Sequence, residues 1–287
     1  MQVKEQPLVF DCQGEQLIGI IHQGESEIRI GVLIVVGGPQ YRVGSHRQFL
    51  LLARALALHG TPVMRFDVRG MGDSGGEQRF FDQLDDDIRA AVDCFLASCP
   101  QLDHIVLWGL CDAASAAVFF AYQDDRVKGM VLLNPWVFTE QGAAKAYLKH
   151  YYLQRLMSRD FWTKIFRFKF NFGESISSLL GLIMQTRGDD KSVPVCKLDM
   201  VDPSLSLPMR MRECFARFSG PVLLILSGRD LTADEFKDVV SADPVWQELI
   251  AASTVMKHYF AEADHTFSSA VWRDQVAEWT ISWIKQL

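Results

Sequence analysis

Strand-like and helix-like segments alternate along most of the 287 residues, and this alternation constrains the fold more than any other feature of the sequence. Such an order is typical of a mostly parallel sheet with helices on both faces. The predicted strands are residues 7–10, 16–22, 31–36, 62–66, 104–108, 127–133, 221–227 and 255–260. The predicted helices are residues 49–60, 82–97, 112–122, 244–251 and 268–285. We therefore expect an α/β protein with an eight-stranded, mostly parallel sheet.

The alternation breaks between residues 138 and 218, which predicts an insertion between two strands. We expect residues 1–137 and 219–287 to form the core and residues 138–218 to form a mostly helical cap. Within this insertion, residues 141–170 are rich in basic and aromatic side chains. Such a segment can rest on an anionic membrane surface or cover an anionic substrate. Alternatively, it presents a solvated basic face and packs its aromatic face on the core.

Composition and charge exclude several classes of function. The formal net charge of −6 argues against general nucleic-acid binding. No secretory signal and no apolar run of membrane-spanning length is found in the sequence. The six cysteines show no spacing typical of a zinc site or a disulfide scaffold, and no phosphate-binding glycine motif is present. We therefore expect a reduced, cytoplasmic protein without a metal or nucleotide cofactor.

Polar and glycine-rich motifs follow four of the predicted strands. GGPQY follows residues 31–36, GLCDAA follows 104–108, GRD follows 221–227 and EADHTF follows 255–260. Ligands of open parallel sheets bind beyond the carboxyl ends of the strands, so these motifs should meet at one edge. They present a nucleophile, an acid and a histidine in that chain order, which is the order found in α/β-hydrolases.

With these motifs, and with RFDVRGMGDSGG at residues 65–76, the sequence resembles the α/β-hydrolase superfamily over nearly its whole length. Within the superfamily, GLCDAAS and LSGRDLTADEF resemble the exosortase A system-associated hydrolases of type 1. Those are bacterial proteins linked to exopolysaccharide and protein-sorting loci. The resemblance implies a hydrolase fold and that genomic setting, but it implies no substrate.

Cys111 occupies the nucleophile position of the motif GLCDAAS. The strand-to-helix turn there requires small residues two positions before and after the nucleophile, and Gly109 and Ala113 meet this requirement. The following helix points its positive end at the thiol, and a nearby imidazole would further favour the thiolate. The alternative is a buried cysteine that acts as a small apolar residue. The position of Cys111 in the turn favours the nucleophile.

His265 is the candidate base, because it alone among the seven histidines follows the last strand in a short loop before the final helix. Asp230 is the candidate acid that orients it. The spacing Gly228-Arg229-Asp230 is one residue shorter than the family pattern, which leaves Asp234 as a rival. Both aspartates also suit the first turn of a helix.

Two backbone N–H groups are candidates for the oxyanion hole. Gly38 would donate from the GGP loop, because Pro39 has no N–H, and Asp112 would donate from the residue after the nucleophile. The Asp112 side chain either caps its helix or shapes the charge of the site. Its carboxylate would oppose formation of a thiolate, so we do not assign it as a base.

The leading hypothesis is hydrolysis of a small-molecule acyl ester or thioester through an acyl-cysteine intermediate. A second hypothesis is an acyltransferase that passes the same acyl group to a sugar hydroxyl or an amine. A third is a non-catalytic protein that binds a partner or lipid through the cap. The nearly complete triad argues against the third hypothesis, while the sequence does not separate the first two and leaves the oligomeric state open.

Overall fold

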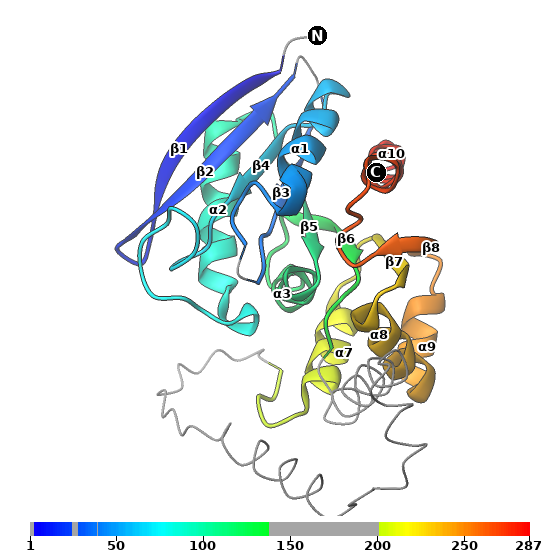
Figure 1. Cartoon of the computed structure of the whole chain (residues 1–287). Coiled ribbons are helices and arrows are strands. Elements are labelled where there is room, and N and C mark those ends of the chain that lie inside the picture. The colour runs from blue at the N-terminus through cyan, green and yellow to red at the C-terminus, as the bar shows by residue number, and fades with distance from the viewer. Residues whose placement is uncertain (1–2, 25–27, 39, 138–200) are drawn as a thin grey trace, which may run out of the picture. The chain divides into compact units, whose positions relative to one another are not determined.

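The described strands form one sheet in the order β1-β2-β4-β3-β5-β6-β7-β8 (Figure 1). The computed structural model describes residues 3–24, 28–38, 40–137 and 201–287. The strands are β1 (Lys4–Cys12), β2 (Glu15–Gln23), β3 (Ile30–Ile34), β4 (Val63–Phe66), β5 (His104–Leu110), β6 (Val127–Leu133), β7 (Val222–Arg229) and β8 (Val255–Asp264). The β1–β2 and β2–β4 pairs are antiparallel and the other pairs are parallel. The predicted eight-stranded, mostly parallel sheet is therefore confirmed.

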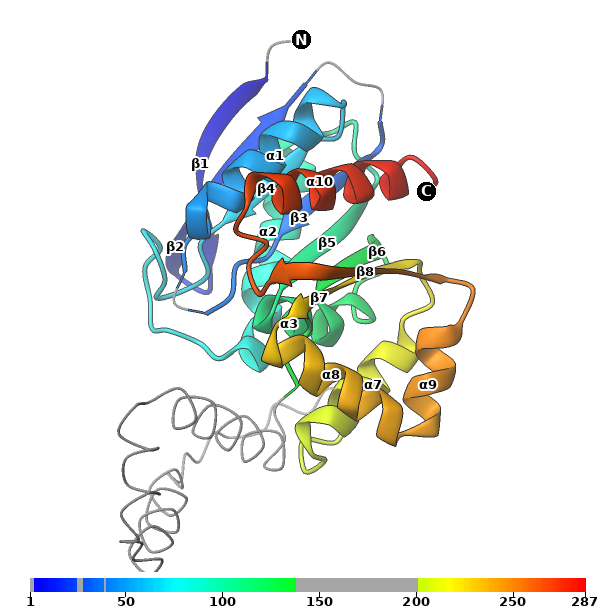
Figure 2. The same ribbon diagram turned by 45° about the vertical axis from the view of Figure 1, so that its right-hand side comes forward.

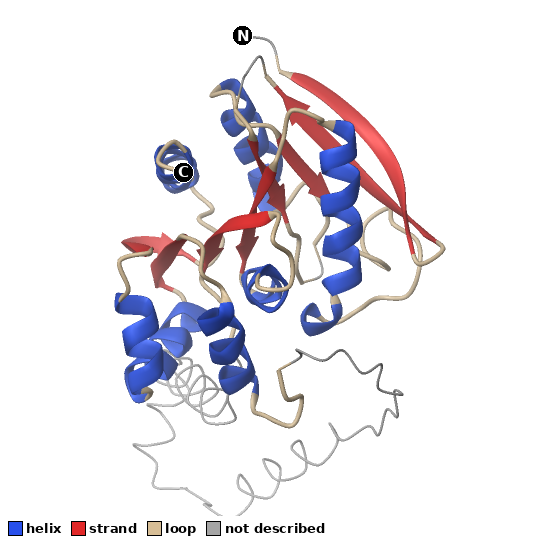
Figure 3. Cartoon of the chain, turned by 180° about the vertical axis from the view of Figure 1, so that it is seen from behind, coloured by secondary structure: helices blue, strands red, loops and turns tan. Residues whose placement is uncertain are grey.

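Helices cover both faces of this sheet. The α-helices are α1 (Gln48–Leu58), α2 (Asp85–Ser98), α3 (Asp112–Ala121), α7 (Leu207–Arg217), α8 (Leu231–Ala242), α9 (Pro244–Ala251) and α10 (Ala270–Ile284). Helices α1 and α10 contact each other on one face, while α2 and α3 contact each other on the opposite face, which Figure 3 shows from behind. Short 3-10 helices lie at Ser45–Arg47 and Phe81–Gln83.

The apolar runs form strands because both of their faces are buried. In β5, Val106, Trp108 and Leu110 join the core beneath α1 and α10, and the alternating residues Ile105 and Leu107 are also fully buried. Since successive side chains of a strand point to opposite faces, each apolar residue has a buried environment. This packing fixes the end of β5 and the turn that follows it.

Two helices are not among those that the sequence predicts individually: α8, and α7, which lies within the insertion predicted to be mostly helical. Helix α8 follows β7 directly, and Asp230 caps its first turn by accepting from the N–H groups of Thr232 and Ala233. Helix α7 lies inside the predicted insertion and contacts α3 and α9. It buries Met211, Cys214 and Phe215. Both helices pack on the core, α7 against α3 and α8 against β7.

The described residues up to Val137 and from Asp202 belong to one compact unit. Residues 138–200, which make up most of the predicted cap and include the basic aromatic segment 141–170, lie outside the described residues. The cap, its boundaries and its membrane contact therefore stay predictions. None of the described helices is long and apolar enough to cross a membrane.

Candidate active site

Cys111 lies in the sharp turn between β5 and α3. Its backbone has φ 62° and ψ −124°, a conformation that is uncommon for a residue other than glycine. The turn is tight enough to require glycine at position 109, because a Cβ there would lie 2.5 Å from the carbonyl oxygen of Ala113. Cys111 is half-buried and stands at the N-terminus of α3. The partial positive charge of this helix end favours an anion at the sulfur.

The loop between β8 and α10, which Figure 2 shows, carries His265 to the same edge of the sheet. Nδ1 of His265 lies 2.9 Å from Oδ2 of Asp230, and the Cys111 side chain is a second hydrogen-bond partner of the ring. Asp230 is almost buried, with 6% of its side chain exposed, whereas His265 is 36% exposed. Because Asp230 takes Nδ1, the other ring nitrogen is left for Cys111. The three predicted residues therefore form a hydrogen-bonded series.

The rival acid, Asp234, lies elsewhere. Its side chain is 42% exposed and makes an ion pair with Lys237 at 2.8 Å, one turn further along α8. Asp230, by contrast, has two roles that the sequence analysis treats as alternatives. It caps α8 through both carboxylate oxygens and also binds the histidine ring.

The hydrogen bond that His265 makes to Asp230, and then the one it shares with Cys111, raises the pKa of His265 to about 10, against an opposing effect of burial. A raised pKa means that the imidazolium persists as the pH rises, up to about pH 10, rather than deprotonating near 6.5. We expect an NMR titration of a His265 ring carbon to show this. Asp230→Asn should lower the His265 pKa more than Cys111→Ser does, because Asp230 is the larger cause. A midpoint near 6.5 in the unaltered protein would contradict the ion pair.

The predicted oxyanion donors are close to each other, but a side chain already binds one of them. The N–H of Gly38 donates to Oδ2 of Asp112 at 2.7 Å, and the N–H of Ala113 donates to Oδ1 at 3.0 Å. Burial raises the pKa of Asp112, and these backbone hydrogen bonds oppose the shift. From the sequence we expect this side chain either to cap its helix or to shape the charge of the site. The bond from Gly38 to the carboxylate is not among these expectations.

Asn134, at the end of β6, is a site residue that the sequence analysis misses. The side chain is fully buried; Nδ2 donates to the carbonyl oxygen of His265 at 3.0 Å, and Oδ1 accepts from the N–H of Ser227 at 2.9 Å. It thus ties the histidine loop to β7, the strand that leads to Asp230. The signal in the sequence is a polar residue directly after a buried strand, at the edge where the other motifs meet.

The glycine-rich loop after β4 has a structural role. Asp67 is fully buried and accepts from the N–H groups of Arg42 and Asp73, at 2.6 and 3.0 Å. It also makes an ion pair with the Arg42 guanidinium. Through these contacts Asp67 joins the loop that follows Gly38 to the glycine-rich loop. The motif RFDVRGMGDSGG therefore braces the loop that carries Gly38.

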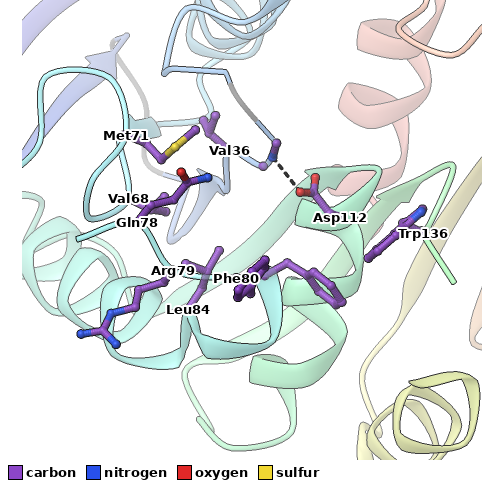
Figure 4. A pocket seen from close by; sticks show the side chains of 12 residues that line it. Val36, Val68, Met71, Gln78, Arg79, Phe80, Leu84, Asp112 and Trp136 are labelled. Atoms are coloured by element: carbon purple, nitrogen blue, oxygen red, sulfur yellow. Dashed lines mark hydrogen bonds between the residues drawn. The ribbon is translucent and has the colours of Figure 1, made fainter. Parts of the chain in front are cut away.

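Two cavities adjoin at this edge of the sheet. One, of about 230 Å³, is lined by Cys111 and His265 together with Gln40, Phe49 and Leu110. The other, of about 170 Å³, is lined mainly by apolar side chains, as Figure 4 shows. Gly37, Gly38, Asp112 and Trp136 line both cavities. Among the described residues, no group of three or more His, Cys, Asp or Glu side chains is arranged to hold a metal ion.

Comparisons with known proteins concern the family model that the sequence matches and the fold. Residues 31–241 match the model of a family described as serine aminopeptidase, S33, whereas no curated protein matches the sequence. The esterase Pf2001 of Pyrococcus furiosus is similar in structure, with a TM-score of 0.65, 16% identity, and coverage of 99% of this chain and 93% of that one. Est1E of Butyrivibrio proteoclasticus, solved with ferulic acid bound, has a TM-score of 0.61, 16% identity, and coverage of 97% of this chain and 99% of that one.

A further similar structure is an alpha-beta serine hydrolase homologue from Coxiella burnetii. It has a TM-score of 0.57, 16% identity, and coverage of 96% of both chains. At such low identities the likeness concerns the fold alone. The predicted α/β-hydrolase fold is thereby confirmed, and the choice of substrate has to be argued from this chain's own residues.

Proposed function

Because the chain belongs to the serine aminopeptidase S33 family of α/β hydrolases, we propose that it hydrolyses a small-molecule ester or thioester with a cysteine nucleophile. Cys111 is the nucleophile, His265 the acid and base, and Asp230 the residue that orients His265. The hydrogen-bonded series from Asp230 through His265 to Cys111 is the observation that carries this proposal. The family is named for a serine, so the cysteine in the turn is a departure that the proposal must explain.

The raised pKa of His265, caused first by Asp230, supports an imidazolium beside the sulfur. An imidazolium partner and the N-terminus of α3 both stabilise a thiolate. In this mechanism the nucleophile is formed before substrate binds, and no base has to remove its proton during the attack. A serine hydroxyl at the same place depends on such a transfer, since it is far harder to ionise.

In the acylation step, the Cys111 sulfur forms a bond to the acyl carbon, and the carbonyl electron pair moves to its oxygen. The N–H groups of Gly38 and Asp112 are the proposed donors to this oxyanion. When the oxyanion collapses, the bond to the leaving group breaks, and His265 gives the leaving group its proton. His265 then takes a proton from water, the resulting hydroxide attacks the acyl carbon, and the thiolate is released with the carboxylic acid.

Mass spectrometry of the intact protein tests this proposal. After incubation with p-nitrophenyl acetate or S-phenyl thioacetate, we expect one acetyl adduct, located by peptide mapping at Cys111. The matched control is Cys94→Ala, because Cys94 is also a half-buried free cysteine. Adduct on Cys94 rather than Cys111, or no adduct under conditions of steady turnover, would contradict the acyl-cysteine mechanism. Added amine or sugar acceptors separate hydrolysis from acyl transfer by their products.

The proposed setting of the reaction is a bacterial exopolysaccharide or exosortase system. Its support is the resemblance of the motifs GLCDAAS and LSGRDLTADEF to the exosortase A system-associated hydrolases of type 1. In the present chain these motifs contribute Cys111 and Asp230, so the resemblance concerns the residues of the proposed triad. Deletion of this gene, alone and together with an exosortase gene, tests the link. The link predicts that deletion changes the amount of exported polysaccharide, and an unchanged amount would contradict it.

A further inference from the structure

The Asp112 carboxylate occupies the place where an oxyanion should bind. It accepts from the N–H groups of Gly38 and Ala113, at 2.7 and 3.0 Å, and Figure 4 shows the bond to Gly38 as a dashed line. Gly38 is the donor that the reaction needs from its loop. A carboxylate is a stronger acceptor than the neutral carbonyl oxygen of an ester, so an incoming substrate competes poorly for this N–H.

The chain around Asp112 leaves room for this carboxylate. A Cβ at position 37 would lie 2.1 Å from Oδ1 of Asp112, so only glycine allows the side chain to lie against this loop. The side chain is half-buried, and its ionised form has backbone donors as partners. The Asp112 side chain thus links the N-terminus of α3 to the loop after β3.

Asp112 also stands between the two cavities. The catalytic cavity holds Cys111 and His265, and the apolar cavity is lined by side chains that include Val68, Met71, Phe80, Phe81 and Leu84. Each is smaller than the roughly 300–1,000 Å³ of most ligand sites. Trp136, the other large side chain shared by both walls, packs edge-on against the Phe81 ring with 5.1 Å between centroids. Asp112 is the shared side chain that can rotate away without breaking an aromatic contact.

We propose that Asp112 is a gate: its carboxylate closes the oxyanion donor Gly38, and its displacement joins Cys111 to the apolar cavity, which receives an apolar acyl group. This inference rests on the proposed function and names the substrate class, namely esters or thioesters of apolar acyl chains. Burial of the acyl chain favours the open state, because the removal of each apolar CH₂ group from water is favourable. A short acyl group buries few CH₂ groups and so gains little from the open state. The Asp112 carboxylate therefore stays bound to Gly38 and slows the reaction of such substrates.

Kinetics of the full chain test the gate. Asp112→Ala should raise kcat/KM for p-nitrophenyl acetate and hexanoate by about tenfold or more, since charge-assisted bonds no longer compete for the donor. Asp112→Asn should give a smaller rise, because its amide oxygen still accepts. In the unaltered protein hexanoate should be the better substrate. The control, Asp234→Ala, removes an exposed first-turn carboxylate of α8 and should change neither value. A folded Asp112→Ala protein with equal or lower kcat/KM would overturn the gate.

A second measurement needs no turnover. In the unaltered protein the Gly38 amide proton should resonate far downfield, because it donates to a carboxylate at 2.7 Å. In Asp112→Ala it should move upfield and then shift saturably with added acetate, while the unaltered protein should not respond to acetate. If the Gly38 signal is the same in both proteins, the gate is wrong. If no protein forms an acyl adduct, the proposed function fails, and the Gly38 signal alone then decides the gate.

Discussion

Replacing Cys111 with alanine should remove the acyl adduct and lower ester and thioester turnover by about a thousandfold or more. The sulfur is the atom that forms the bond to the acyl carbon in the proposed reaction, and His265 and the oxyanion donors have no nucleophile to assist without it. Alanine should fit the turn, since it is smaller than cysteine and the positive φ of 62° is already tolerated for a residue with a Cβ. Steady-state kinetics and circular dichroism of the variant check both expectations.

Cys111→Ser is the sharper variant. The hydroxyl fits the same turn, but it does not ionise beside the imidazolium, so a site that depends on a preformed ion pair should lose most of its activity. A site in which His265 removes the proton during the attack would retain much more. Serine activity close to that of the cysteine enzyme would therefore contradict the ion-pair mechanism while leaving Cys111 as the attacking residue.

Alkylation gives an independent measure of the thiolate. Burial raises the pKa of the other described cysteines: Cys12 to about 11, Cys214 to about 12, and Cys94 and Cys99 upward as well. At mildly acidic pH these thiols should react slowly with iodoacetamide. Peptide mapping should find Cys111 labelled ahead of them, and His265→Ala should slow that labelling. Labelling of Cys111 no faster than of Cys94 would contradict activation of the Cys111 thiol.

The fold could be predicted where the residues carry one dominant signal. Strands buried on both faces, such as β6, appear as continuous apolar runs, and its predicted bounds, 127–133, agree with the structure. Helix α8 carries no such signal, because it buries only Ala233 and Phe236 and its sequence mixes acidic, basic and apolar residues. Its existence depends on the cap that Asp230 supplies and on packing against α9. Local sequence patterns do not contain that packing.

The site divides in a similar way. Cys111, Asp230 and His265 could be singled out because each follows a strand of one parallel sheet, so topology alone brings the positions together. The contacts of Asp112 and Asn134 depend on loops that meet across the sheet edge. Gly38 is 74 positions from Asp112, and His265 is 131 positions from Asn134. No periodicity or motif encodes pairs so far apart, and for this reason the hydrogen bond between Gly38 and Asp112 emerges only from the structure.

Asp230→Asn should lower turnover by about a hundredfold or more; in serine triads the corresponding change costs about 10⁴. Asparagine is as good a helix cap as aspartate, and its amide oxygen, in the place of Oδ1, can still accept from the N–H of Thr232. The fold and α8 should therefore survive. The charge that holds the imidazolium is lost, however, and an asparagine N–H facing Nδ1 favours the wrong tautomer of His265. Activity should fall mainly through kcat, with the unfolding temperature little changed.

Asp234→Asn is the matched control, because it removes a carboxylate from the first turn of the same helix. Asp234 is exposed and pairs with Lys237, and such a surface ion pair contributes about 0–1 kcal/mol to stability. We expect its turnover and its pH profile to match those of the unaltered protein. In Asp230→Asn, by contrast, the alkaline decline in activity should begin at a lower pH than in the unaltered protein, because Asp230 is the largest cause of the raised pKa of His265. If Asp234→Asn is the inactive variant instead, the acid role belongs to Asp234, and the hydrogen bond between Asp230 and His265 is structural.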